Sequence, residues 1–399
     1  MVRDATSPFT PGRPVPVEFF VGRQAEIERL RQKVRNAVGG RRIEVAFVSG
    51  ERGIGKSSLA SFVRYLCEKD PGTLGIHAFL GGVDTVQDAV KKVFDGLLKE
   101  TVETTFFESI KGLFGKHVRE VGLFGISVEF APEERELKTL ANNFAPALQN
   151  LLDRLKDKRN GIVLILDDIN GLAGSAEFAN WFKSFVDEVS TSQRALPLCV
   201  IFVGLDERRH SLIRVQPSLA RVFEPVDIRA WSDVESRGFF ENAFRKANMR
   251  CEPEALDLLT RYAGGFPVLA HEIGDAAFSA NQDDHIGMQD AIEGVVAAAE
   301  IVGRRYLDPI VYKSMRSERY RAILRRMAKE LKHERFTRAE LRGSLPEDER
   351  GVFDSFLKKM KALGVLVEDP AGERGSYRFT NRLHHLYFSL QAEKPDREE

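Results

Sequence analysis

The stretch 43–57, IEVAFVSGERGIGKS, decides the fold of this chain. Its first seven residues are apolar or β-branched apart from one glutamate and a final serine, which predicts a buried strand. Residues 50–57 fit the pattern G-x-x-x-x-G-K-[ST], and an amphipathic helix is predicted from Lys56 to about Glu68. A glycine-rich loop between strand and helix lets backbone N–H groups surround phosphate oxygens. The stretch therefore predicts a phosphate-binding loop.

The residues of this loop have distinct expected roles. Lys56 is expected to reach the β- and γ-phosphates of a nucleotide and to act in catalysis, and the Ser57 hydroxyl is expected to bind magnesium. The helix N-terminus adds the positive end of its dipole. ATP and Mg²⁺ are thus the predicted cofactors. The residues expected to contact the nucleotide here are Gly50, Glu51, Arg52, Gly53, Ile54, Gly55, Lys56, Ser57 and Ser58.

A second apolar strand ends in two carboxylates, in the stretch 163–168, VLILDD. Asp167 is expected to hold magnesium, directly or through water, and Asp168 to polarise the attacking water. Apolar strands that end in acidic residues are common, so this motif indicates a nucleotide site only in combination with the predicted phosphate-binding loop. Together the two motifs predict hydrolysis of a nucleoside triphosphate.

The first half of the chain alternates strands with helices, which predicts an α/β fold with a parallel sheet covered on both faces. Strands are expected at 43–49, 75–79, 162–166, 198–203 and 226–228, and helices at 23–38, 56–68, 83–98, 136–156 and 178–190. A Phe-rich helix and a strand-like stretch over 122–130 form an insertion at about 101–135. It is expected either to serve as an interface or to pack on its own domain, which Phe and Leu at helical spacing favour.

The second half has a different pattern. Helices alone are predicted for 231–296, interrupted by GGFP at 264–267. Three helices at 319–331, 338–344 and 347–363, followed by strands at 365–368 and 377–379, have the order of a winged helix. The predicted domains are an extended, proline-containing arm (1–17), an ATPase core (18–229), a helical lid (230–300), a winged-helix domain (301–390) and an acidic tail (391–399).

On these motifs the sequence resembles P-loop ATPases of the AAA+/STAND group. It is most similar to bacterial and archaeal "AAA family ATPase" proteins related to origin-recognition and transposon-regulator ATPases. The resemblance covers about residues 8–300, and rests on VPVEFFVGR (15–23), GERGIGKSS (50–58), VLILDD (163–168) and GGFP (264–267). It implies a P-loop parallel-sheet sandwich of the ASCE/AAA+ type, followed by an α-helical lid and a C-terminal winged helix.

The resemblance also implies roles for residues outside the loop. Val21, Gly22 and Arg23 are expected to lie against the adenine, and Pro267 of the lid to contact the nucleotide. Arg221 stands where many family members place an arginine finger, which also implies an oligomer. Arg208 and Arg209 remain alternatives for that role.

Two departures from the family pattern bear on hydrolysis. The family usually has Glu where this chain has Asp168, one methylene shorter, so hydrolysis is expected to be slow, or the nucleotide to act as a switch. The strand 199–203 runs into Gly204, Leu205 and Asp206, and no γ-phosphate sensor is identified there.

The distribution of charged residues predicts a polyanionic partner for residues 301–390 only. The 399 residues hold 59 Lys/Arg and 59 Asp/Glu, which excludes a uniformly basic scaffold, yet residues 301–390 carry +8 and residues 1–300 carry −6. Duplex DNA is the predicted partner of the winged helix, and an acidic start to its third helix, Glu347–Glu349, argues against tight base recognition. The expected DNA contacts are Arg350, Lys358, Lys359, Lys361, Arg374 and Arg378.

Several classes of protein are excluded on sequence. The longest apolar runs are far shorter than the ~18 residues that span a bilayer, and no signal peptide is recognised, so no membrane partner is expected. Cys67, Cys199 and Cys251 stand far apart, which predicts neither a disulfide framework nor a zinc site, and indicates a cytoplasmic protein.

Three functional hypotheses remain open. The first is an ATP-driven switch that assembles on or regulates DNA, as in replication, transposition or phage defence, as a homo-oligomer or with an effector protein. The alternative is a STAND-type signalling ATPase with a protein trigger and slow or no hydrolysis. A third hypothesis is a degenerate nucleotide-binding scaffold, which predicts tight ATP binding with no turnover.

Overall fold

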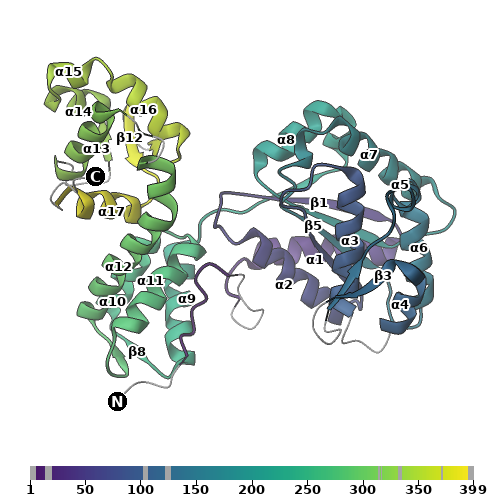
Figure 1. Cartoon of the computed structure of the whole chain (residues 1–399). Helices are drawn as coiled ribbons and strands as arrows, with labels where there is room; N and C mark the ends of the chain where they lie inside the picture. Colours follow the sequence, from purple (N-terminus) through teal and green to yellow (C-terminus); the bar gives the residue numbers. More distant parts are fainter. Residues whose placement is uncertain are drawn as a thin grey trace. The chain divides into compact units, whose positions relative to one another are not determined.

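The structure, a computed structural model, describes residues 6–13, 20–101, 107–121, 127–312, 315, 317–330, 335–369 and 372–393. They form two compact units, and Figure 1 labels many of their helices and strands. The first unit, here called the core, comprises the described residues between 14 and 229. The second unit combines residues 6–13 with those from 230 onward.

The core is built on a five-stranded sheet in the order β2-β5-β6-β1-β7. All of its strand pairs are parallel, so the carboxyl ends of the strands lie at one edge. The predicted α/β fold with a parallel sheet is therefore confirmed. The strands are β1 (Ile43–Ser49), β2 (Leu74–Phe79), β5 (Ile162–Asp167), β6 (Leu198–Val203) and β7 (Glu224–Asp227).

Helices cover both faces of this sheet. On one face lie α1 (Gln24–Gly40) and α2 (Lys56–Lys69), which contact each other and the central strands. On the other face, residues of α3 (Val86–Thr101), α6 (Phe144–Leu155) and α7 (Ala176–Thr191) share one apolar core with alternate residues of the strands. Strand residues two apart point to the same face, so each strand divides its side chains between these two layers. A further helix, α8 (Asp206–Val215), follows β6.

The insertion packs on its own unit where it is described. It consists of α4 (Phe107–Phe114) and the antiparallel hairpin of β3 (Val118–Val121) and β4 (Ser127–Phe130), followed by α5 (Glu134–Asn142). Ile110 and Phe130 are each 1% exposed and belong to the core cluster, with the Phe130 ring 5.5 Å from that of Phe94. Of the strand predicted over 122–130, only 127–130 is a strand among the described residues, because 122–126 lie outside them.

The first half of the second unit is mainly helical. Its helices are α9 (Asp233–Lys246), α10 (Pro253–Ala263), α11 (Pro267–Ala280) and α12 (Met288–Val302). The prediction of helices alone was wrong at one point, since β8 (Arg250–Cys251) and β9 (His285–Ile286) form a short parallel pair. Two-residue strands carry too little periodicity to be recognised in a sequence.

The N-terminal arm docks on these helices, and its described residues 6–13 form neither helix nor strand. Phe9 is 4% exposed and lies 5.8, 6.2 and 5.2 Å, between ring centroids, from three phenylalanines of α9. The Thr10 N–H donates to His271 Nδ1 at 3.1 Å. Gly274 of α11 faces the Phe9 ring so closely that a Cβ there would be 2.3 Å from it. The aromatic partners on α9 are Phe239, Phe240 and Phe244.

The C-terminal part combines helices with a three-stranded antiparallel sheet in the order β10-β12-β11. The predicted order of three helices and two strands recurs, but β10 and α17 were not predicted. The elements are a π-helical segment (Gly303–Tyr312), α13 (Glu318–Glu330), β10 (Arg335–Thr337), α14 (Arg338–Ser344), α15 (Glu347–Arg350), α16 (Phe353–Ala362), β11 (Leu366–Glu368), β12 (Ser376–Phe379) and α17 (Arg382–Glu393).

The single helix predicted over 347–363 is wrong, because α15 ends at Arg350 and α16 begins at Phe353. Glu349 is 6% exposed and pairs with Arg326 of α13 at 3.5 Å, which fixes the short α15 separately. The acidic residues 347–349 therefore do not open α16.

Among the described residues, no helix combines the length and apolar character needed to cross a membrane. The cytoplasmic location stays a prediction.

Candidate ATP site

The predicted phosphate-binding loop connects β1 to α2 at the carboxyl edge of the sheet. Gly50 has φ +152°, and a Cβ at this position would lie 2.6 Å from the Ile228 carbonyl oxygen, so only glycine fits. Gly55, with φ +92°, precedes the first residue of α2. The loop therefore has the strand, turn and helix that the sequence predicted, and all nine loop residues named above lie between β1 and the first turn of α2.

Lys56 folds back onto its own loop. Its Nζ donates to the carbonyl oxygens of Gly50 at 3.0 Å and Glu51 at 2.7 Å. Burial lowers the pKa of the Lys56 amine, while the charge of Asp167 is the largest influence in the opposite direction. The structure thus brings the loop lysine and the carboxylate of β5 within electrostatic reach of each other.

Asp167 ends β5 and is buried, with 3% of its surface exposed. Its Oδ2 lies 3.0 Å from His77 Nε2, whereas Oδ1 has no hydrogen bond among the described residues. His77 was not predicted as a functional residue, although a histidine inside the apolar stretch LGIHAF was the available signal.

The donors at this edge suit magnesium. Ser57 offers a hydroxyl at the start of α2 and Asp167 a carboxylate oxygen. Within the described part of the chain, no group of three or more His, Cys, Asp or Glu side chains could hold a metal ion. Mg²⁺ is commonly held by one or two protein oxygens together with substrate phosphates and water, so a small oxygen set beside a phosphate loop fits it.

Asp168 has a left-handed backbone, φ 57°, directly after the strand. Its N–H donates to the Val203 carbonyl at 3.1 Å, and its exposed carboxylate accepts a hydrogen bond from the Asn170 amide. Gly81 approaches the other carboxylate oxygen, since a Cβ on Gly81 would be 2.9 Å from Asp168 Oδ2. Asn170, two residues further along the chain, was not singled out in the sequence.

Arg23 is 6% exposed and bound by backbone carbonyls. Its guanidinium donates to Ile54 O at 3.2 Å and to Arg229 O, so it joins the loop to the end of the core. Val21 and Gly22 lie just before α1 and are partly exposed, while residues 15–19 of the same motif lie outside the described residues.

The three candidates for the arginine finger, Arg208, Arg209 and Arg221, differ in their hydrogen bonds and exposure. Arg221 is exposed at the end of a 3₁₀ turn, and its side chain has no hydrogen bond or ion pair among the described residues. Arg209 pairs with Asp206 at 2.7 Å, and the Nε of Arg208 is buried without a partner. After β6, Gly204 donates its N–H to Val48 O, and no polar side chain follows it directly.

Pro267 belongs to the second unit, where it is buried in the first turn of α11. Gly265 before it has φ +78°, and a Cβ there would be 2.4 Å from the Trp231 carbonyl oxygen.

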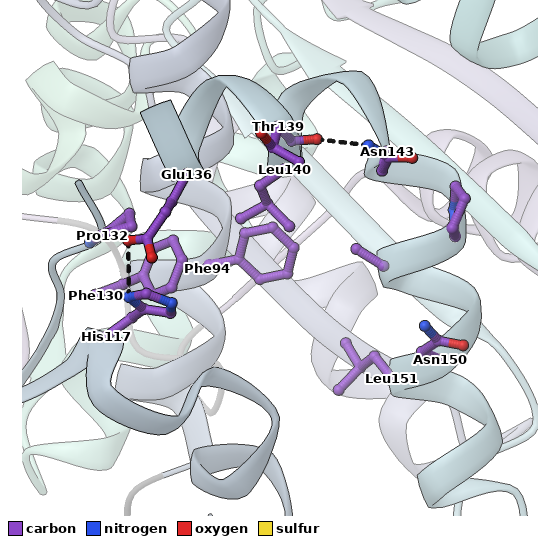
Figure 2. A pocket seen from close by; sticks show the side chains of 12 residues that line it. Phe94, His117, Phe130, Pro132, Glu136, Thr139, Leu140, Asn143, Asn150 and Leu151 are labelled. Carbon is purple, nitrogen blue, oxygen red and sulfur yellow. Dashed lines mark hydrogen bonds and ion pairs between the residues drawn. The ribbon is translucent and has the colours of Figure 1, made fainter. Parts of the chain in front are cut away.

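A separate cavity of about 370 Å³ lies among α3, β4, α5 and α6 (Figure 2). Its walls are mainly apolar, and His117 Nδ1 pairs with Glu136 Oε2 at 3.3 Å at one end. None of the residues predicted for the ATP site lines it. The residues predicted to bind ATP therefore lie outside this cavity.

Comparison with known proteins identifies the first unit. Residues 20–201 match the family described as "AAA ATPase domain". The fold is similar to that of the Walker-type ATPase of Pyrococcus abyssi, with 16% identity, TM-score 0.56 and coverage of 93% of this chain and 96% of that one. It is also similar to the Aeropyrum pernix ORC2 protein in ADPNP–ADP complexes, with 16% identity, TM-score 0.58 and coverage of 96% and 95%. No curated protein matches the sequence significantly.

The chain thus carries an AAA ATPase domain over residues 20–201, and the resemblance predicted from its motifs is confirmed. The matched residues include the loop 50–58 and the two aspartates 167 and 168, which supports ATPase activity of this domain.

Proposed function

We propose that this ATPase is a nucleotide-driven switch that acts on duplex DNA, in replication, transposition or phage defence. The observation that supports it most is a set of basic side chains without partners among the described residues of the C-terminal part: Lys358, Lys359 and Arg374. They lie on α16 and in the turn between β11 and β12, in an element order typical of a winged helix.

The proposed hydrolysis uses the groups at the carboxyl edge of the sheet. Lys56 exchanges the carbonyls of Gly50 and Glu51 for phosphate oxygens, while loop N–H groups and the N-terminus of α2 bind the remaining phosphate charge. Ser57 and Asp167 would hold Mg²⁺, which when bound neutralises charge on the β- and γ-phosphates.

Asp168 is the proposed base. Its carboxylate is exposed to solvent, so a water molecule can approach it, and the Asn170 amide fixes its orientation. It would orient the attacking water and accept its proton. Arg221, exposed and unpaired within the described residues, is the proposed finger that completes the site of a neighbouring subunit in an oligomer.

The six basic residues predicted to contact DNA divide into two groups. Arg350 donates to the carbonyls of Leu345 (2.7 Å) and Gly343 (2.9 Å), and Lys361 pairs with Glu368 at 2.7 Å. Arg378 reaches carbonyl oxygens of its own strand end at 3.4 and 3.5 Å. These three already have partners within the chain, so Lys358, Lys359 and Arg374, which have none among the described residues, are the stronger candidates for phosphate contacts.

The test is binding of a duplex of about 30 base pairs to the full chain, measured by fluorescence anisotropy across a salt series. Each lost phosphate contact is expected to reduce the salt slope by about 1. Lys358→Glu/Lys359→Glu should therefore weaken binding at least about tenfold and flatten the slope by about 2. The matched control is Lys92→Glu/Lys138→Glu, which makes the same change in charge at two exposed lysines of the core. Equal DNA affinity in both double variants would contradict the proposal.

The alternative is a STAND-type switch with a protein trigger. Asp168 supports it, because a carboxylate one methylene shorter than Glu, on a left-handed backbone, reaches less far toward a water molecule. Phosphate release measured with and without DNA separates the two. Turnover stimulated by DNA supports the first function, and tight ATP binding with near-zero turnover in both conditions supports the second.

A further inference from the structure

Three side chains join helix α2 to the end of strand β5 through hydrogen bonds. Ser61 Oγ lies 3.1 Å from His77 Nδ1, and His77 Nε2 lies 3.0 Å from Asp167 Oδ2. His77 is 5% exposed and Asp167 is 3% exposed, so both groups are shielded from bulk water. A buried polar group needs a partner, and each of these provides the other's.

Regular secondary structure fixes the positions of this relay, which we define as Ser61, His77 and Asp167. Ser61 follows Ser57 by four residues on α2, so the two hydroxyls share one face of the helix. His77 is in register with Ile165, and Asp167 lies two residues beyond Ile165 on the same face of the sheet. Because α2 contacts both β2 and β5, the relay bridges the helix that begins the phosphate loop and the strand that ends in the carboxylate.

The direction of the hydrogen bonds follows from the chemistry of the groups. An ionised carboxylate can only accept, so His77 Nε2 must carry a proton and donate it to Asp167 Oδ2. His77 Nδ1 can then accept the Ser61 hydroxyl proton. The Phe79 ring stacks on the imidazole at 4.2 Å with an interplanar angle of 19°, which restricts rotation of the His77 ring. Only Oδ1 of Asp167 stays without a hydrogen bond among the described residues.

We propose that His77 is a positioning residue for magnesium. By occupying Oδ2 it leaves Oδ1 of Asp167 as the oxygen available to the ion, and through Ser61 it ties that carboxylate to the helix that carries Ser57. This proposal rests on the proposed magnesium role of Asp167. Groups that orient a metal ligand typically contribute about 10–100-fold to metal affinity or activity.

The experiment measures binding of a fluorescent, non-hydrolysable ATP analogue to the full chain, in EDTA and across a Mg²⁺ titration. His77→Leu should raise the Mg²⁺ concentration for half-maximal effect by about 10–100-fold, while affinity in EDTA stays within about twofold. His77→Gln should recover most of this loss, since its amide can donate to Asp167. His117→Leu is the control, because it removes the histidine of another carboxylate pair in the core and should leave the Mg²⁺ titration unchanged.

A second variant covers the case in which His77→Leu does not fold, as judged by circular dichroism. Ser61→Ala keeps the imidazole and removes one hydrogen bond, so it should raise the required Mg²⁺ about 2–10-fold. Wild-type Mg²⁺ dependence in Ser61→Ala and in every folded His77 variant, with a clear loss in Asp167→Asn, would overturn the relay alone. No change in Asp167→Asn would instead overturn the proposed magnesium role.

Discussion

Two buried histidines, one in each unit, are held in opposite ways. In the core, His77 Nε2 lies 3.0 Å from Asp167 Oδ2 at the carboxyl edge of the sheet, and we infer that it donates to this carboxylate. In the second unit, His271 accepts the Thr10 N–H at Nδ1, while its Nε2 is buried without a partner. Burial lowers the pKa of His271 to about 4, so it serves as a neutral acceptor.

The difference shows how one residue type supports either chemistry or packing. His77 contacts a carboxylate that we propose to hold magnesium, whereas His271 binds a segment of chain more than 250 residues away in sequence. We therefore expect perturbation of the core edge to change catalysis with little effect on stability, and perturbation of the arm contact to do the reverse. Three measurements test this contrast.

The largest effect is the loss of folding stability expected for Phe9→Ala. Removing a fully buried phenylalanine typically costs about 3–5 kcal/mol, and this ring fills a site bounded by three aromatic side chains and Gly274. Hydrogen exchange should show lost protection in α9 and α11 with β1 and β5 unaffected. Val234→Ala, at an 81% exposed position of α9, should change the free energy of unfolding by less than about 0.5 kcal/mol. Uniform loss of protection in both units would contradict the separation.

A smaller effect in energy, confined to catalysis, is expected from Asp168→Ala. Loss of a general base lowers turnover by about 10²-fold or more, which corresponds to about 2.7 kcal/mol. Steady-state phosphate release should fall accordingly, while affinity for the ATP analogue and the unfolding transition stay near those of the wild type. Asp168→Glu is the matched variant and should retain turnover, since its longer side chain keeps the carboxylate. Full activity of Asp168→Ala would place the base elsewhere.

The smallest of the three effects is the loss of folding stability expected when the pH is lowered to 5. His271 binds its proton more weakly when folded (pKa about 4) than when unfolded (about 6.5), so the unfolded state is favoured as pH falls through this window. Its contribution is fully present above about pH 6.5 and is reduced by about 2 kcal/mol at pH 5. Urea unfolding of the wild type and His271→Gln at pH 7.5 and 5.0 isolates this residue, because Gln can still accept from Thr10. Burial also lowers the pKa of His384 to about 4, so part of the acid sensitivity should remain in the variant. Identical pH dependence in the two proteins would exclude His271 as its source.

Local sequence pattern predicted much of the core. Strand β6 is a continuous apolar run, β5 is apolar up to Asp167, and β1 is apolar apart from Glu44 and Ser49. The spacing of the glycine-rich loop is typical of phosphate-binding loops. The features that the sequence pattern did not predict depend on contacts between segments that are distant in the sequence. His77 acquires its role only because β2 pairs with β5, and Phe9 is buried only because α9 and α11 meet around it.

The C-terminal part shows the same limit. Apolar spacing over 347–363 suits one helix, but the ion pair of Glu349 with Arg326 and the break at Gly351 divide it in two. Likewise, the position of a basic residue in the sequence does not show whether its charge is paired within the fold or is exposed to a partner. Arg350 and Lys358 lie eight residues apart, yet the first binds its own backbone and the second is exposed without a partner among the described residues.

The docked arm also has a consequence for synthesis on the ribosome. Phe9 leaves the exit tunnel about 230 residues before Phe239, the first of its aromatic partners. At a translation rate of about 5–20 residues per second, the helices that bury Phe9 are synthesised on the order of ten to fifty seconds after it. In that interval residues 14–229 are translated, so the five-stranded sheet can form while the Phe9 ring still lacks the helices that bury it.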